Sequence, residues 1–144
     1  MPKGAGWLSL VGFFGLAVAA DAQTPLSQTA GSQFDGTYAL VSSTRLTELF
    51  TVPQTGRTRP CPDWEVGPLT IVGGQARVSF VSTSHAVHAD FDGMVGSKGE
   101  LVIRSVNSAY DAPAEGLLNG RIDGTGTVRA RLISRCNFDY VWRK

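Results

Sequence analysis

The sequence predicts an all-β fold, namely a small antiparallel β-barrel or sandwich of about eight strands held by one disulfide. Short apolar segments recur at spacings near ten residues and are separated by glycine-rich turns, which is typical of sandwiches and barrels. After residue 22, no segment has the periodicity of a convincing long helix. Two cysteines follow an apparent export signal, and this combination favours a disulfide.

The length and the charge limit the classes of function. The chain has 144 residues, enough for one domain. Its 13 Lys and Arg residues nearly balance its 12 Asp and Glu residues, so the net charge is +1. This balance argues against a strongly basic nucleic-acid-binding protein and against an acidic disordered tail. We therefore expect no nucleic-acid partner.

The first 22 residues have the organisation of a secretory signal peptide. Lys3 supplies a positive charge, and an uncharged run of 14 residues follows from Trp7 to Ala20. This run is too short for a comfortable membrane span, and an uncleaved anchor is the alternative. Small residues occupy the signal-peptidase positions of Ala20-Asp21-Ala22. We expect cleavage after Ala22, a periplasmic or secreted location, and membrane contact only through the cleaved segment.

The expected mature chain begins with a flexible arm. Residues 23–33 are small and polar without a period, which is typical of a disordered start. Residues 34–144 are expected to form the β-barrel domain, and its first strand is expected over residues 34–42.

The next two segments are less regular. Residues 45–52 fit either a strand or a helical turn, because Leu46, Leu49 and Phe50 would share one helical face. Residues 53–68 hold four prolines, which cannot run through a central strand. We therefore expect a long loop there.

The clearest hairpin spans residues 69–81. Gly73-Gly74 suits a two-residue turn with positive φ, and residues 76–81 alternate apolar with polar side chains. Further strands are expected over residues 87–95, 100–106, 117–122, 127–134 and 137–143.

The two cysteines are expected to form a structural disulfide. In an exported chain, Cys61 and Cys136 most simply pair with each other. A catalytic or metal-binding thiol is the alternative, but the sequence has no CxxC motif and neither histidine flanks a cysteine.

The ends of the domain resemble calycin-type small barrels, which include lipocalins, avidins and small bacterial metalloprotease inhibitors. Gly36-Thr37-Tyr38 opens the first strand, and Trp142-Arg143 ends the last. Barrels of this type open with Gly-x-Trp, here with Tyr38 in place of the Trp, and many pack a last-strand Arg across that ring. The resemblance implies a closed barrel with either an internal cavity or a packed core.

The resemblance and the apolar pattern favour a carrier of a small apolar or amphiphilic ligand. The residues expected to line its cavity are Tyr38, Phe80, Tyr140 and Trp142. Phe138 alternates with Tyr140 and Trp142 on the last strand, and such a stripe also fits an ordinary core.

The alternative function is binding to another protein. Arg57, Arg59 and Trp64 in the long loop are of the types enriched at binding hot spots. Trp64 also fits a side chain that caps the barrel end or stacks on a sugar. The resemblance implies a periplasmic protease inhibitor that uses its N-terminal segment, here residues 23–33. A structural envelope component is a further alternative.

Catalysis and metal binding are not expected. The sequence contains neither a G-x-S-x-G nor an HExxH motif, so we expect no enzyme and no cofactor. His85 and His88 would point to opposite faces of a strand, although His88, Asp90 and Asp92 would share one. We therefore expect no metal site.

A row of arginines is the last candidate feature. On neighbouring strands these residues would align either as an anion-binding row or as an ordinary solvated face. The four residues are Arg77, Arg104, Arg129 and Arg131.

Overall fold

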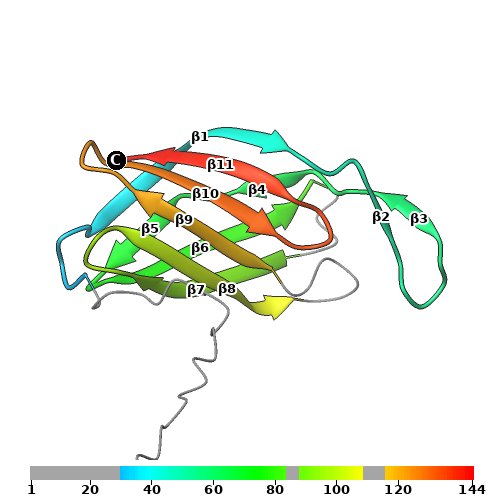
Figure 1. Ribbon diagram of the computed structural model, residues 1–144, viewed down its shortest axis with the longest axis horizontal. Coiled ribbons are helices and arrows are strands. Elements are labelled where there is room, and N and C mark those ends of the chain that lie inside the picture. Colours follow the sequence, from blue (N-terminus) through cyan, green and yellow to red (C-terminus); the bar gives the residue numbers. More distant parts are fainter. Residues whose placement is uncertain (1–29, 84–87, 109–115) are drawn as a thin grey trace, which may run out of the picture.

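The computed structural model describes residues 30–83, 88–108 and 116–144, and none of them lies in a helix. Within these residues eleven strands form, and eight of them close an antiparallel β-barrel (Figure 1). The all-β prediction is confirmed, and the sheet closes as a barrel rather than stacking as a sandwich. The strands are β1 (Gly36–Arg45), β2 (Leu49–Thr51), β3 (Thr58–Pro60), β4 (Trp64–Val66), β5 (Leu69–Val72), β6 (Gln75–Ser82), β7 (His88–Val95), β8 (Glu100–Ser108), β9 (Leu117–Ile122), β10 (Thr127–Ile133) and β11 (Phe138–Arg143).

The barrel is an up-and-down meander. From β5 to β11 each strand pairs with the next one in the chain, and β11 returns to pair with β1. β4 pairs with β6 beyond the end of β5, so the two short strands together occupy one position in the barrel. This topology is compatible with a calycin-like fold.

The predicted glycine hairpin is confirmed. β5 and β6 pair through Val72 and Gln75 around the turn. Gly73 and Gly74 have φ values of 58° and 80°, a backbone conformation that side chains with a Cβ rarely adopt. The two glycines therefore set the register of this hairpin.

The prediction of a continuous loop over residues 53–68 is wrong in part. Two short strands, β3 and β4, interrupt this segment. Pro60 is tolerated because β3 belongs to a two-stranded hairpin with β2, outside the barrel. The ambiguous segment at residues 45–52 contains the strand β2, not a helical turn.

The barrel interior is filled by aromatic and aliphatic side chains. The rings of Phe80 and Phe91 lie 4.8 Å apart, and those of Phe80 and Tyr140 lie 5.4 Å apart. Tyr140 also contacts Phe138 and Trp142, with centroid distances of 5.8 and 5.5 Å. These rings join one continuous apolar core that extends along the barrel.

One end of the barrel is closed by the segment that leads into β1. The Ala30 N–H donates to the Val95 carbonyl at 2.9 Å, and Ala30 and Phe34 pack against the core. The Tyr38 hydroxyl donates to the Phe34 carbonyl at 2.7 Å. Residues 30–33 of the expected flexible arm thus form a turn on the barrel, whereas residues 23–29 lie outside the described residues.

The expected signal peptide, residues 1–22, also lies outside the described residues. In the part of the chain that the structure describes, no helix has the length and apolarity needed to cross a bilayer.

Candidate functional site

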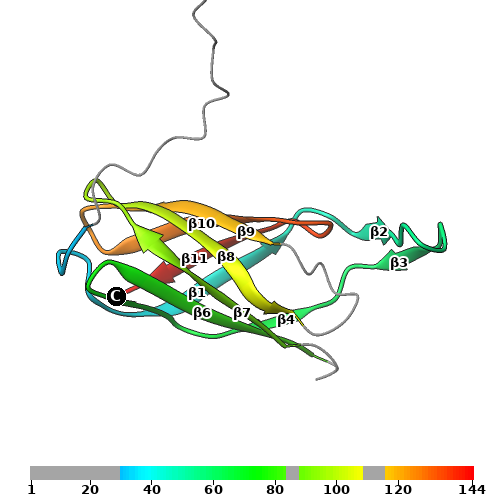
Figure 2. The same ribbon diagram turned by 90° about the horizontal axis from the view of Figure 1, so that it is seen from below.

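The β2–β3 hairpin projects from one end of the barrel (Figures 1 and 2). Leu49 pairs with Pro60, and Thr51 pairs with Thr58. The Val52 N–H donates to the Arg57 carbonyl at 2.8 Å and closes the hairpin toward its tip. Since an isolated two-stranded hairpin is marginally stable, its base needs support from the barrel.

Both ends of the hairpin are attached to the β10–β11 turn. Cys61 forms a disulfide with Cys136, with 5.7 Å between their Cα atoms, so the predicted disulfide is confirmed. On the other side, the Leu46 N–H donates to the Asn137 carbonyl at 2.9 Å. The Thr47 hydroxyl accepts from the Asn137 N–H at 3.2 Å. These bonds hold the hairpin in place relative to the barrel.

The hairpin carries exposed apolar and basic side chains. Leu49 is 58% exposed and Leu46 at its base is 46% exposed. Arg57 and Arg59 are also exposed, and neither has a described ion-pair partner. The sequence predicts both arginines in a loop, but Arg59 lies in the strand β3. From the sequence, Leu46 and Leu49 are expected only to share one face of a possible helical turn, and no pattern marks them as binding residues.

Trp64 is separated from the two arginines. It lies in β4, is half-buried, and meets the Phe80 ring edge-on with 6.2 Å between centroids. Its indole N–H is buried and has no hydrogen-bond partner within the described residues. Trp64 therefore packs against the core at this end of the barrel, and the hairpin surface consists of Leu46, Leu49, Arg57 and Arg59.

The four residues expected to line a ligand cavity all face the barrel interior. Tyr38, Phe80, Tyr140 and Trp142 are each at most 1% exposed. The Tyr140 ring contacts those of Phe80 and Trp142, and the Trp142 indole N–H donates to the Gly67 carbonyl at 3.2 Å. The structure thus brings these three together as packed core side chains.

The barrel wall is open along part of β1. β1 pairs with β5 from Gly36 to Tyr38 and with β11 from Ala39 to Arg45. If the β1–β5 register continued, Pro68 would lie opposite Ala39. Proline has no N–H for the ladder, and β4 pairs with β6 instead of β1. We call this interruption between residues 39–45 of β1 and β4 the seam.

Side chains bridge the seam at two points. The Trp142 indole reaches from β11 to the Gly67 carbonyl, just before β5. The Arg45 guanidinium, at the end of β1, pairs with Asp63 and with Glu48. Arg45 also lies over the Phe138 ring, 5.9 Å from its centroid.

The Tyr140 hydroxyl lies beneath the seam without a hydrogen bond of good geometry among the described residues. Burial, the larger effect, raises the pKa of this phenol, and the nearby Ser43 hydroxyl opposes that shift. Ser43 is the cross-strand partner of Tyr140, so both side chains point inward. Ser43 is nevertheless exposed, which means that solvent reaches the interior side of β1.

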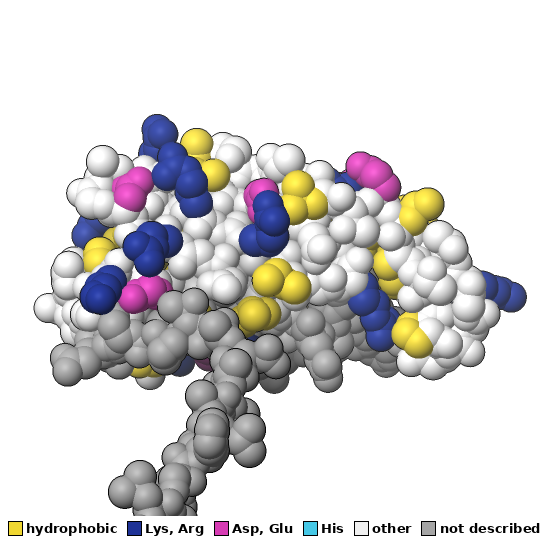
Figure 3. Space-filling model, viewed as in Figure 1, with side chains coloured by type: hydrophobic (Ala, Val, Ile, Leu, Met, Phe, Trp, Pro, Cys, Tyr) yellow, Lys and Arg dark blue, Asp and Glu magenta, His cyan; other side chains and the backbone are white. Residues whose placement is uncertain are grey.

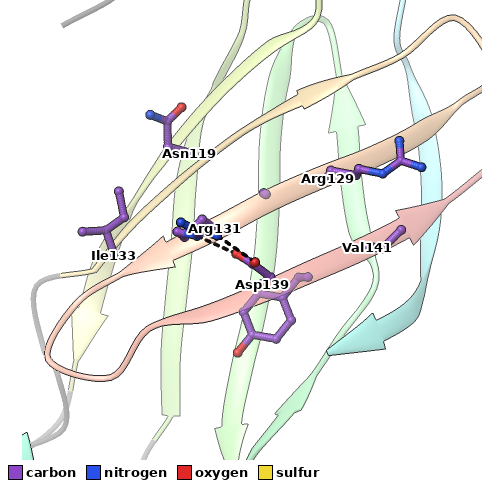
Figure 4. Close-up of a pocket in the computed structure, with 8 residues that line it drawn as sticks. Asn119, Arg129, Arg131, Ile133, Asp139 and Val141 are labelled. Atoms are coloured by element: carbon purple, nitrogen blue, oxygen red, sulfur yellow. Dashed lines mark hydrogen bonds and ion pairs between the residues drawn. The ribbon is translucent and has the colours of Figure 1, made fainter. Parts of the chain in front are cut away.

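The outer face of β9, β10 and β11 forms a shallow concavity of about 490 Å³ (Figure 4). Arg131 binds Asp139 through two hydrogen bonds of 2.7 and 2.9 Å. These bonds lower the pKa of the Asp139 carboxyl and raise that of the Arg131 guanidinium. Arg129 pairs with Asp123 at 3.2 Å.

The four predicted arginines do not form one row: Arg129 and Arg131 on β10 lie on this face, whereas Arg77 on β6 lies on the opposite side of the barrel. Arg77 pairs with Asp92 at 2.8 Å, so three of the four arginines already have carboxylate partners. Figure 3 shows basic side chains on this face beside acidic and apolar ones. Because the charges alternate in sign, the arrangement is that of a solvated face with paired charges, not a row of free arginines.

His88 and the neighbouring carboxylates lie on the outer face of β7. The His88 Nε2 atom lies 3.1 Å from Asp90, and the Ser79 hydroxyl donates to the same oxygen at 2.7 Å. His85 lies outside the described residues. Within residues 30–83, 88–108 and 116–144, no group of three or more His, Cys, Asp or Glu side chains is arranged to hold a metal ion.

Comparisons with known proteins found no relative of this chain. No protein-family model matches the sequence, and neither curated proteins nor solved structures gave a significant match.

Proposed function

We propose that this protein is an exported, non-catalytic protein-binding module that contacts its partner through the β2–β3 hairpin. The observation that carries the proposal is a projecting hairpin with exposed Leu49, supported at its base by the Cys61–Cys136 disulfide. A support of this kind lowers the entropy lost when a binding loop is ordered. The disulfide-bonded barrel fits an extracellular location, and a periplasmic or secreted protein is proposed.

The composition of the hairpin supports a protein partner. Exposed Leu46 and Leu49 offer apolar area, and exposed Arg57 and Arg59 offer donors for carboxylates or carbonyls. Arginine is enriched at interface hot spots, whereas apolar area supplies the driving force for association. A protease inhibitor and a structural envelope component are both members of this class.

Glutamate substitutions at two exposed apolar residues, Leu49 and Val72, test the proposal. Leu49→Glu alters the hairpin, and Val72→Glu alters the β5–β6 turn at the other end of the barrel, where Val72 is 66% exposed. Chemical cross-linking in the producing cell's envelope should capture the same protein with the wild type and Val72→Glu, and lose it with Leu49→Glu. Equal capture by all three proteins would overturn the hairpin assignment.

The second candidate is the carrier of a small apolar ligand. One observation favours it: Tyr38, Phe80, Tyr140 and Trp142 all face the barrel interior, as a carrier requires. Native mass spectrometry of the exported protein distinguishes the two functions. Non-covalent mass that disappears on denaturation supports the carrier, whereas a bare polypeptide supports a solid barrel that binds through its surface.

A further inference from the structure

The seam leaves one side of β1 without a strand partner. From Ala39 to Arg45, six residues pair with β11 on one side, Val41 lies at a bulge, and no described strand pairs with this stretch on the other side. Backbone N–H and C=O groups in a strand alternate between its two sides. One set of these groups therefore points toward β4 without a ladder partner, over a length similar to that of a whole average strand.

The exposure of β1 differs from that of a strand inside a closed barrel. Ala39 and residues 41–44 are all exposed, including inward-pointing Ser43 and outward-pointing Thr44. Residues 69–71 of β5, which has strands on both sides, are buried or half-buried. Because the inward-pointing Ser43 is exposed as well, this part of β1 is open to solvent along the seam.

Two buried polar groups near this edge lack a well-formed hydrogen bond: the Trp64 indole N–H has no partner among the described residues, and the Tyr140 hydroxyl has only the Ser43 hydroxyl nearby. The Tyr140 hydroxyl lies beneath Ser43 on the β1 side, and the Trp64 indole N–H belongs to β4 on the other side. Both rings contact Phe80. A buried donor without a partner is costly. An oxygen acceptor placed beneath the seam would therefore satisfy these donors.

We propose that the seam binds an extended β-strand of a partner protein, which adds to the free edge of β1. This rests on the proposed protein-binding function and names what the partner contributes. A repeating row of backbone donors and acceptors is matched by another extended backbone. The bound strand carries a side chain with an oxygen acceptor, such as Asp, Asn, Ser or Thr, at a position that faces Tyr140 and Trp64.

The ion pair between Arg45 and Asp63 sets where the strand enters. It spans the seam at the hairpin end, whereas β1 and β5 close the opposite end at Tyr38. Arg45 and Asp63 are more exposed than the core, with side-chain exposures of 26% and 69%. Exposed ion pairs are weak, so this end opens more readily than the β1–β5 ladder. A partner already bound at the hairpin would lie beside this entrance.

A phage-displayed random decapeptide library, panned on the full chain, supplies probes for this site. Ser43→Lys places an ammonium on the inner face of the seam, and Thr44→Lys places the same group one residue away on the outer face. Selected peptides should bind Ser43→Lys at least about tenfold more weakly than the wild type. Thr44→Lys should bind them within about twofold of the wild type, because its ammonium stays in water.

Amide hydrogen exchange of the wild type provides a second measurement that does not depend on how well Ser43→Lys folds. In the free protein, amides of residues 39–45 that point into the seam should exchange rapidly, and a bound peptide should slow them. Three results would overturn the proposal: slow exchange of all these amides in the free protein, failure to select any peptide, or equal affinities for the two lysine variants.

The same exchange experiment separates this proposal from the hairpin proposal. A peptide that protects residues 49–60 but leaves residues 39–45 unchanged supports binding at the hairpin and overturns strand addition at the seam. A peptide that protects residues 39–45 and still binds Leu49→Glu supports strand addition at the seam. The cross-linking experiment then tests partner binding by the hairpin separately.

Discussion

The Lys144 ammonium lies 5.8 Å from the centre of the Tyr38 ring, so a residue that follows the last strand covers an aromatic residue of the first. Lys144 also donates to the Asp35 carbonyl. The resemblance to calycin-type barrels predicts a last-strand Arg across the ring of the first-strand aromatic residue, but Arg143 in β11 is exposed and Lys144 lies over Tyr38 instead. The contact closes the end of the barrel opposite the hairpin.

Two tyrosine-to-phenylalanine substitutions should have different effects on stability. Tyr38→Phe removes the hydrogen bond to the Phe34 carbonyl and should lower the free energy of unfolding by about 1 kcal/mol. Tyr140→Phe removes a buried hydroxyl that lacks a well-formed hydrogen bond and should leave stability unchanged or higher. Urea unfolding of both variants measures the difference. A larger loss for Tyr140→Phe than for Tyr38→Phe would contradict this account.

Reduction of the disulfide should destabilise the whole barrel. The bridge joins residues 75 positions apart, and chain-entropy arithmetic assigns it about 4 kcal/mol. The melting temperature should therefore fall on reduction, and also in the double variant Cys61→Ser/Cys136→Ser. An unchanged melting temperature in both cases would show that the constraint contributes nothing to stability.

Stability at low pH should depend on Asp123. A hydrogen bond from the Thr125 hydroxyl, together with backbone N–H groups of Thr127 and Thr125, lowers the pKa of Asp123 to about 2. Because the pKa of Asp in an unfolded chain is about 3.9, the ionised carboxylate stabilises the fold above that pH. This stabilisation is lost as the pH falls toward 2.

Urea unfolding from pH 5 downward, compared between the wild type and Asp123→Asn, tests this sign. The advantage of the wild type should shrink as the pH drops through the interval between the two pKa values. An advantage that grows on acidification would contradict the assigned hydrogen bonds.

Two glycine-to-alanine substitutions test the packing of the barrel wall. A Cβ on Gly93 in β7 would lie 2.1 Å from the Val102 carbonyl oxygen on the adjacent strand, so Gly93→Ala should cost about 1–3 kcal/mol. A Cβ on Gly124 would meet no atom within 4 Å, so Gly124→Ala should be nearly neutral. Thermal unfolding of both variants gives the comparison, and equal melting temperatures would disprove it.

Local patterns predicted the barrel strands well. Residues 69–81 were predictable because Gly73-Gly74 selects a tight turn and the following strand alternates in polarity. The disulfide was predictable because two cysteines in an exported chain leave a simple pairing. The inward direction of Phe80 followed from its place in the alternating strand.

Features that depend on distant contacts were not predictable. Residues 58–60 form a strand because they pair with β2, and the prolines around them had indicated a loop. The pairing of Arg131 with Asp139 requires the register between β10 and β11. The seam arises because β5 pairs with β1 but β4, which precedes it across Gly67-Pro68, does not, and no short sequence pattern shows which partner a strand will choose.

The common attachment of both hairpin ends has a mechanical consequence. Cys61 is bonded covalently to Cys136, and Leu46 is hydrogen-bonded to Asn137 in the same turn. A pull on the hairpin tip is therefore delivered to the β10–β11 turn, from which it loads the ladders that join β10 to β9 and β11 to β1. Strands loaded along their length must break many hydrogen bonds at once, so the barrel resists tension from a tethered partner better than it would if the hairpin hung from β1 alone.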